Sequence, residues 1–172
     1  MSATENHHQE THPSALTDSK LDAMPGHLIR RLHQIAVGTF ASELIDIGIT
    51  PVQFAALKTI AANAGIDQRT LAQRIALDTS TTAGVIDRLE SRGTVERRNA
   101  PNDRRLRVLY ITPAGIDLLH AAHPLVDNVQ SLLVAPLNEQ EQAVFLTLLG
   151  KLVDANNALS RAPSVRASDN TE

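Results

Sequence analysis

The stretch TSTTAGVIDRLESRGTVERRNAPNDRRLRVLYITPAG, Thr79–Gly115, changes its apolar period partway along. Its first part has helical spacing and ends at Gly93, a residue that suits a helix end. The predicted inward-facing side chains of this helix are Thr82, Val85, Ile86 and Leu89. Two segments rich in β-branched residues follow, 94–98 and 105–111, separated by a polar Asn-Ala-Pro-Asn-Asp turn. The stretch therefore predicts a helix followed by a β-hairpin.

A shorter helix precedes this one. Asp67 is suited to cap a helix over 68–75, whose predicted inward-facing side chains are Leu71, Ala72 and Ile75. Because only about four residues separate this helix from Thr79, the two helices must cross steeply, as they do in a helix-turn-helix unit.

Another helix lies upstream of this pair. Thr50, with Gln53 as its reciprocal partner and Pro51 at the first helical position, opens a helix that should end near Gly65. Its predicted buried side chains are Phe54, Leu57, Ile60 and Ala61. An earlier helix over 25–46 is indicated by a stripe at helical spacing: Leu28, Leu32, Ile35 and Thr39.

Two helices follow the hairpin. Thr112-Pro113 repeats the capped opening, and Pro124 should kink or break the helix beyond it, because an interior proline costs ~3 kcal/mol. Asn138, with Glu141 three residues on, caps the last helix. The predicted stripe of that helix is Phe145, Leu148, Leu149 and Leu152. We therefore expect a mainly α fold with a small β-hairpin wing.

Composition limits the class of protein. The absence of Cys excludes disulfides, thiolate metal sites and cysteine-oxidation sensors. No apolar run approaches the ~20 residues that span a membrane, and the start lacks an export signal, so we expect a cytoplasmic protein. His7, His8 and His12 lack further ligands, and we expect no metal site or cofactor. No catalytic triad order, phosphate loop or metal spacing indicates an enzyme.

Positive charge is concentrated in the centre of the chain. Residues 66–111 contain nine Arg, no Lys and six acidic residues, whereas the whole chain has a formal net charge of −3. The planar guanidinium group suits phosphates and base edges, so this distribution favours DNA binding over a merely solvated surface.

Helix-turn-helix units place the start of their second helix in the major groove. The candidate base contacts there are Thr79, Ser80, Thr81, Ala83 and Gly84, although the hydroxyl cluster could instead only cap the helix. The candidate DNA-backbone contacts are Thr70, Arg88 and Arg97. Asp87 or Glu90 could bind Arg88 instead.

The hairpin tip contains Asp103, Arg104 and Arg105. A two-stranded tip is thin enough for the minor groove, whose negative potential attracts arginine. We expect Asp103 to hold the side chain of Arg105 and so reduce its loss of rotamer entropy on binding. The alternative is a surface ion pair worth ~0–1 kcal/mol.

The runs ITPVQFAALKTI, LAQRIALDTSTTAGVIDRLESRGTVERR and PNDRRLRVLYITPAG resemble the MarR family of winged helix-turn-helix repressors. The resemblance covers 49–115 and implies a homodimer on a pseudo-palindromic operator in double-stranded DNA, with the hairpin in the minor groove. Two positions depart from the family. Gly84 replaces a polar or basic residue, and Thr94 replaces an aliphatic one, which we expect to loosen the first wing strand slightly.

The resemblance also implies a domain division. The winged helix-turn-helix domain is expected over 49–112, with a dimerisation helix before it over 21–48 and dimerisation helices after it over 113–159. The segments 1–20 and 160–172 are expected to be disordered tails.

Family members commonly bind small aromatic carboxylates in a cleft beside the winged domain. The candidate effector residues here are His27, Arg30, Arg31, His33 and Phe54, unless the arginines only pair with acids. The whole chain is similar to the family's repressors of nicotinate catabolism, which respond to 6-hydroxynicotinate. The alternatives are an activator on the same fold and a winged-helix adaptor that binds protein.

Overall fold

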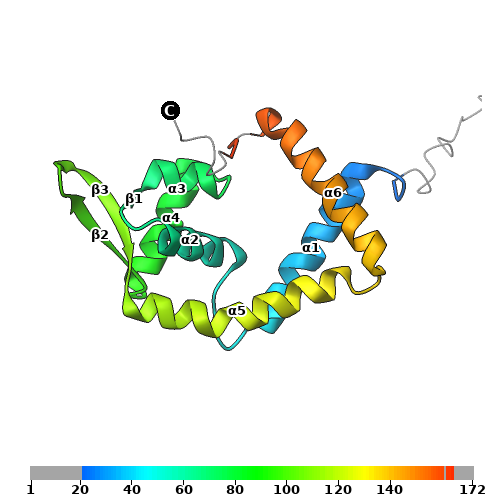
Figure 1. Cartoon of the computed structure of the whole chain (residues 1–172), viewed down its shortest axis with the longest axis horizontal. Helices are drawn as coiled ribbons and strands as arrows, with labels where there is room; N and C mark the ends of the chain where they lie inside the picture. Colours follow the sequence, from blue (N-terminus) through cyan, green and yellow to red (C-terminus); the bar gives the residue numbers. More distant parts are fainter. Residues whose placement is uncertain (1–20, 161, 165–172) are drawn as a thin grey trace, which may run out of the picture. The chain divides into compact units, whose positions relative to one another are not determined.

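The computed structural model describes residues 21–160 and 162–164, and only the backbone of Arg104. Its elements are α1 Pro25–Glu43, α2 Pro51–Ala62, β1 Ile66–Asp67, α3 Gln68–Arg74, α4 Thr79–Ser91, β2 Val95–Ala100, β3 Asp103–Ile111, α5 Pro113–Val134, α6 Glu139–Ala155 and a 3-10 turn Asn157–Leu159 (Figure 1). The predicted mainly α fold with a β-hairpin is confirmed. The predicted tails lie outside the described residues except for 160 and 162–164, and the tail histidines His7, His8 and His12 lie outside them as well.

Side-chain caps begin the helices where the sequence predicts them. The Gln53 backbone N–H donates to Thr50 Oγ1 at 3.2 Å, and the Thr50 N–H donates to Gln53 Oε1 at 3.0 Å. Asn138 and Glu141 form the same reciprocal box before α6. Helix α5 runs unbroken through Pro124. Of the two predicted effects of Pro124, a kink or a break, the break is therefore excluded.

The core of the winged region is built on α2 and α4. The predicted inner face of α4 is confirmed, because all four of its residues are buried. In α2, the prediction is wrong for Ala61, which is exposed, while Ala56 is fully buried. Helix α2 contacts α4, α5 and β3. These neighbours cover more of its circumference than the single stripe assumed from the sequence.

The sheet has three antiparallel strands in the order β1-β3-β2. The predicted hairpin is confirmed, but its strands extend closer to the tip, and the register shifts between Asn99 and Ala100. Strand β1 was not predicted, because a two-residue strand has no visible period. It pairs Ile66 with Leu109 and Asp67 with Val108, and so joins the start of α3 to the base of the hairpin.

The base of the hairpin also packs tightly against the start of α5. A Cβ on Gly115 would lie 2.2 Å from the Thr94 carbonyl oxygen, so the close approach requires glycine. Thr94 is 3% exposed, and its hydroxyl donates to the Leu89 carbonyl at 2.8 Å. The polar group of Thr94 is therefore satisfied within the core, and the expectation that Thr94 loosens the first wing strand stays a prediction.

The chain divides into two units after Ile35, within α1. In the first unit, the predicted stripe of α1 is exposed, with Leu28 at 49% and Ile35 at 55%. In the second unit, α6 has no buried residue, and its stripe is largely exposed, as Leu152 at 54% illustrates. No helix in the described ranges is both long and apolar enough to cross a membrane.

Candidate nucleic-acid interface

The start of α4 is organised by Asp78. Its carboxylate accepts the Thr81 backbone N–H at 2.8 Å, the Ser80 hydroxyl at 2.5 Å and the Thr81 hydroxyl at 2.6 Å. These hydrogen bonds, first that from the Ser80 side chain, hold the pKa of Asp78 well below its usual range. Ser80 and Thr81 are both exposed, and both of their hydroxyls donate to Asp78.

The other predicted base contacts lie on the same exposed end of α4. Thr79 is exposed, and its carbonyl accepts from Gln68 Nε2 at 3.1 Å, which ties α4 to α3. Ala83 and Gly84 are half-buried. A Cβ at Gly84 would meet nothing within 4 Å, so internal packing does not require glycine there. Gly84 thus leaves backbone open at the surface, one turn into the helix.

Thr70, a predicted phosphate contact, belongs to the cap of α3. Its backbone N–H donates to Asp67 Oδ1 at 3.0 Å and its hydroxyl donates to Oδ2 at 2.6 Å. Burial alone would raise the pKa of Asp67, but the hydrogen bonds from Thr70 and Arg69 outweigh it and lower that pKa. Thr70 is half-buried, at the junction of α3 and β1.

Arg88 and Arg97, both predicted backbone contacts, have different surroundings. Arg88 is exposed. The two carboxylates considered as its partners bind Arg97 instead: Arg97 Nη2 lies 2.5 Å from Asp87 Oδ1, and Nη1 binds Glu90 Oε2. The Arg97 side chain is only 21% exposed. Burial would lower its pKa, but the bonds and charges of Asp87 and Glu90 outweigh burial and raise it.

The hairpin tip carries exposed Arg105 and Arg107. Asp103 does contact Arg105, but its Oδ1 accepts from the Arg105 backbone N–H at 2.8 Å, whereas the sequence suggested a bond to the guanidinium. Arg107 donates to Asn99 Oδ1 across the strands at 3.2 Å. Asp103 therefore shapes the turn, and the Arg105 side chain extends from a fixed backbone.

Arg98 lies farther down the hairpin, with its guanidinium 4.8 Å from the centre of the Tyr110 ring and an ion pair to Glu96. The Tyr110 hydroxyl oxygen would lie 3.2 Å from a Cβ at Gly65, whose φ is +82°. Arg98 is exposed, so it adds positive charge to the hairpin surface.

Sequence reasoning missed the contact that Arg92 makes at the far end of α4. Arg92 is the C-cap of α4, and it donates through Nη1 to the Gly48 carbonyl at 2.9 Å and through Nη2 to the Ile47 carbonyl at 2.6 Å. These carbonyls belong to the turn between α1 and α2. The separation of more than forty residues left no local pattern that could have revealed the contact.

Two of the predicted effector residues of α1 lie near an acid, Asp22. His27 Nε2 lies 3.7 Å and Arg31 Nη1 lies 3.8 Å from Asp22 Oδ1. Arg30 donates to Gln34 Oε1 at 2.8 Å and lies 3.4 Å from His27 Nδ1. His33 is exposed. This unit therefore brings His27, Arg30 and Arg31 together.

Phe54, the remaining effector candidate, is a core residue of the second unit. It is 8% exposed, and its ring packs edge-on against Phe40 with centroids 6.4 Å apart. Lys58 Nζ lies 5.9 Å from the ring centre. Its role in the fold is thus packing in the core.

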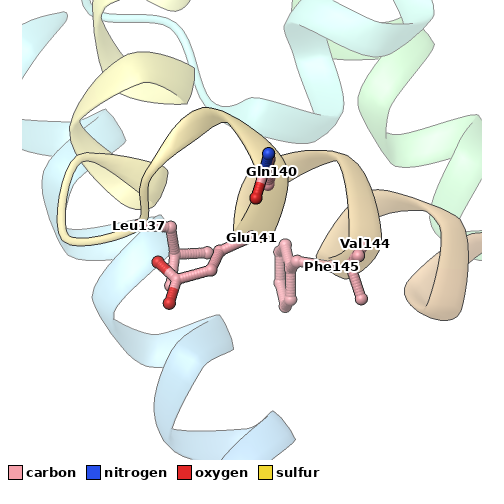
Figure 2. A pocket seen from close by; sticks show the side chains of 5 residues that line it. All are labelled: Leu137, Gln140, Glu141, Val144 and Phe145. Atoms are coloured by element: carbon pink, nitrogen blue, oxygen red, sulfur yellow. The ribbon is translucent and has the colours of Figure 1, made fainter.

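A shallow apolar hollow of about 320 Å³ lies at the start of α6 (Figure 2). Its lining is Leu137, Gln140, Glu141, Val144 and Phe145. None of the residues predicted to bind an effector belongs to it. In the described residues, no group of three or more His, Asp or Glu is placed to hold a metal ion.

Comparison with known proteins places this geometry in context. Residues 49–106 match the MarR family. Transcriptional regulator HosA of Escherichia coli O111:H- is 33% identical, over 75% of this chain and 94% of that protein. The transcriptional repressor NicR of Pseudomonas putida is 30% identical, over 76% and 83%. The structure of Bordetella bronchiseptica BpsR, whose DNA binding is regulated by 6-hydroxynicotinic acid, is similar with a TM-score of 0.73 at 29% identity, over 76% and 94%.

Proposed function

Because the chain belongs to the MarR family, we propose that it is a transcriptional repressor that binds double-stranded operator DNA. The observation that carries this proposal is the exposure of the Ser80–Thr81 start of α4 together with Arg105 at the tip of the attached hairpin. In this arrangement α4 enters the major groove and the hairpin reaches the adjacent minor groove. Arg88 and Arg98 add positive charge toward the phosphates.

We further propose that the operator-binding form is a homodimer. The exposed apolar stripes of α1 and α6 support this, because a water-exposed row of Leu and Ile is stabilised when a second protomer covers it. The hollow at the start of α6 adds Leu137, Val144 and Phe145 to the apolar surface of α6. Two protomers would present two α4 helices, which explains a pseudo-palindromic site.

The proposed effector is a small aromatic carboxylate, with 6-hydroxynicotinate as the first compound to test. The similarity to NicR and BpsR supports this class, as does the cluster of His27, Arg30 and Arg31 on α1. A carboxylate can replace Asp22 as the anionic partner of Arg31, with His27 beside it. We propose that the protein controls an aromatic or N-heteroaromatic degradation operon and its own gene, and the similarity to NicR and BpsR supports the class of operon.

A route for release runs through Arg92. Its two bonds join the turn after α1 to the C-terminal end of α4. A ligand that favours a different position of that turn would therefore also favour a different position of α4, and the spacing of the two α4 helices would no longer fit the half-sites. A ligand that binds the arrangement unfit for the half-sites a hundredfold more tightly than the fitting one supplies ~2.7 kcal/mol of coupling.

The test is a gel-shift assay on the DNA flanking the gene, with and without a panel of aromatic acids that includes 6-hydroxynicotinate and benzoate. The expected result is protection of a two-fold symmetric site, weakening with salt, and release by one member of the panel. Equal affinity for unrelated duplexes would contradict the proposal. Arg105→Ala separates a repressor from a protein-binding adaptor. A repressor should lose operator affinity in this variant while it stays folded and dimeric.

A further inference from the structure

We propose that Arg97 is a positioning residue that locks the β2–β3 hairpin to α4, so that helix and hairpin engage DNA as one rigid body, and that its guanidinium does not itself bind phosphate. This inference rests on the proposed function. It assigns Arg97 a role different from the backbone contact that its charge and position in the sequence suggest.

The geometry joins two elements that the chain connects only through a short turn. Arg97 lies on β2, and its guanidinium spans Asp87 and Glu90, which are three residues apart and hence neighbours on the surface of α4. Glu90 also accepts the Arg97 backbone N–H at 3.4 Å through its other oxygen. Both the side chain and the backbone of Arg97 are therefore tied to the same helix.

The charges make a direct phosphate contact unfavourable. A single guanidinium faces two carboxylates, so the cluster carries a net negative charge and attracts no phosphate. To reach DNA, Arg97 would have to leave both partners and a position in which its side chain is 21% exposed. It would also uncover two negative charges on α4, the helix proposed to enter the groove.

The benefit lies in the rigidity of the hairpin. The opposite edge of β3 is held by β1 over only two residue pairs, at Leu109 and Val108. Among the residues whose side chains the structure describes, Arg97 is the one that connects the hairpin to α4 by ion pairs. A hairpin already fixed relative to α4 loses less freedom on binding than a mobile one, which strengthens the contact of Arg105.

The matched control for Arg97 is Arg98. It is the next residue on β2, removes the same charge when replaced by alanine, and its carboxylate partner Glu96 lies on β2 itself and not on α4. The experiment measures operator affinity for Arg97→Ala, Arg98→Ala and each of them combined with Arg105→Ala. The probe is a duplex selected from random-sequence DNA by the wild-type protein.

A positioning role predicts coupling between Arg97 and Arg105. Arg97→Ala should weaken operator binding about tenfold when Arg105 is present and less than twofold when Arg105 is already alanine. In the second case the fixed hairpin no longer has an Arg105 guanidinium to position on the DNA. Arg98→Ala should give the same factor in both backgrounds. In the Arg105→Ala background, Arg97→Ala should leave the salt dependence unchanged. Additive losses, or a slope reduced by ~0.9, would identify a phosphate contact and overturn the proposal.

In a second variant, the two possible roles of Arg97 predict opposite changes in operator affinity. Asp87→Asn with Glu90→Gln frees Arg97 and removes two negative charges from α4. If Arg97 is a phosphate ligand, this variant binds DNA more tightly; the positioning role predicts weaker binding, by about the same factor as Arg97→Ala. Because this variant keeps Arg97 itself, it remains decisive even if Arg97→Ala fails to fold.

A measurement without DNA completes the test. Amide hydrogen exchange of β2 and β3 should accelerate at least threefold in Arg97→Ala and by a smaller factor in Arg98→Ala, which loses only contacts within the hairpin; equal rates in all three proteins would contradict the role. Failure of the selection to enrich any sequence would contradict the proposed function. An enriched sequence bound with additive losses would contradict only the role of Arg97.

Discussion

Arg92 donates to the carbonyl oxygen of Gly48 at 2.9 Å, and this bond connects the end of α4 with the turn that follows α1. The same side chain also binds the neighbouring Ile47 carbonyl. A fork that binds two adjacent carbonyls fixes both the distance and the orientation of the two segments.

Replacing Arg92 by alanine should therefore separate DNA binding from its control. We expect operator affinity without effector to fall by less than threefold and the free energy of unfolding to fall by about 1 kcal/mol, since the lost bonds are exposed. The ratio of operator dissociation constants with and without the releasing acid should shrink about tenfold. Arg88→Ala is the control, and an unchanged ratio in Arg92→Ala would disprove this route.

Asp78→Asn should leave α4 folded, because asparagine caps a helix as well as aspartate does. It removes the anionic acceptor of the Ser80 and Thr81 hydroxyls, so both can turn and donate elsewhere. We expect base preference to relax several-fold at the positions that α4 faces, measured by selection from random DNA. Asp67→Asn, the equivalent change in the cap of α3, should keep the wild-type preference; a matching shift there would point to a general loss of stability.

The acid side of the stability profile should also depend on Asp78. The folded-state pKa of Asp78 lies below its unfolded value, so its contribution is fully present at neutral pH and is lost as the pH falls below the ordinary Asp pKa of about 3.9. Thermal unfolding from pH 7 to pH 2 should therefore show a smaller acid-induced decrease in Asp78→Asn than in wild type. Parallel profiles would be inconsistent with this linkage.

Gly115→Ala tests the packing of α5 against the hairpin. The added Cβ would lie 2.2 Å from the Thr94 carbonyl oxygen and 2.7 Å from Ile111 Cγ1, so backbone has to move. We expect a loss of about 3 kcal/mol in the free energy of unfolding, as for a strongly overpacked core. Gly84→Ala adds a methyl group in open space and should cost nothing. Equal stability of the two variants would show that α5 shifts freely.

Local chemistry made much of the fold predictable. The Thr-Pro and Asn-x-x-Glu caps and the inner face of α4 depend on residues within four positions of one another, and they were found correctly. Strand β1 and the burial of Ala56 were missed, because both depend on segments that are distant in the sequence.

The candidate site followed the same division. The exposed hydroxyls of α4 and the arginines of the hairpin could be placed from spacing alone. Which charge binds which partner could not: Asp87 and Glu90 were considered as partners of Arg88 on their own helix, and they bind Arg97 on the neighbouring strand. The partner of a long charged side chain depends on which groups the fold brings close to it, and the order of residues along the chain does not show this.

The most direct test of the central claim is the operator affinity and stoichiometry of wild type and Arg105→Ala on the selected duplex. We predict two protomers per duplex, half-sites about 10 base pairs apart centre to centre, and a loss of at least tenfold in Arg105→Ala, which should stay folded and dimeric. One protomer per duplex, or an affinity that Arg105→Ala leaves unchanged, would contradict the account.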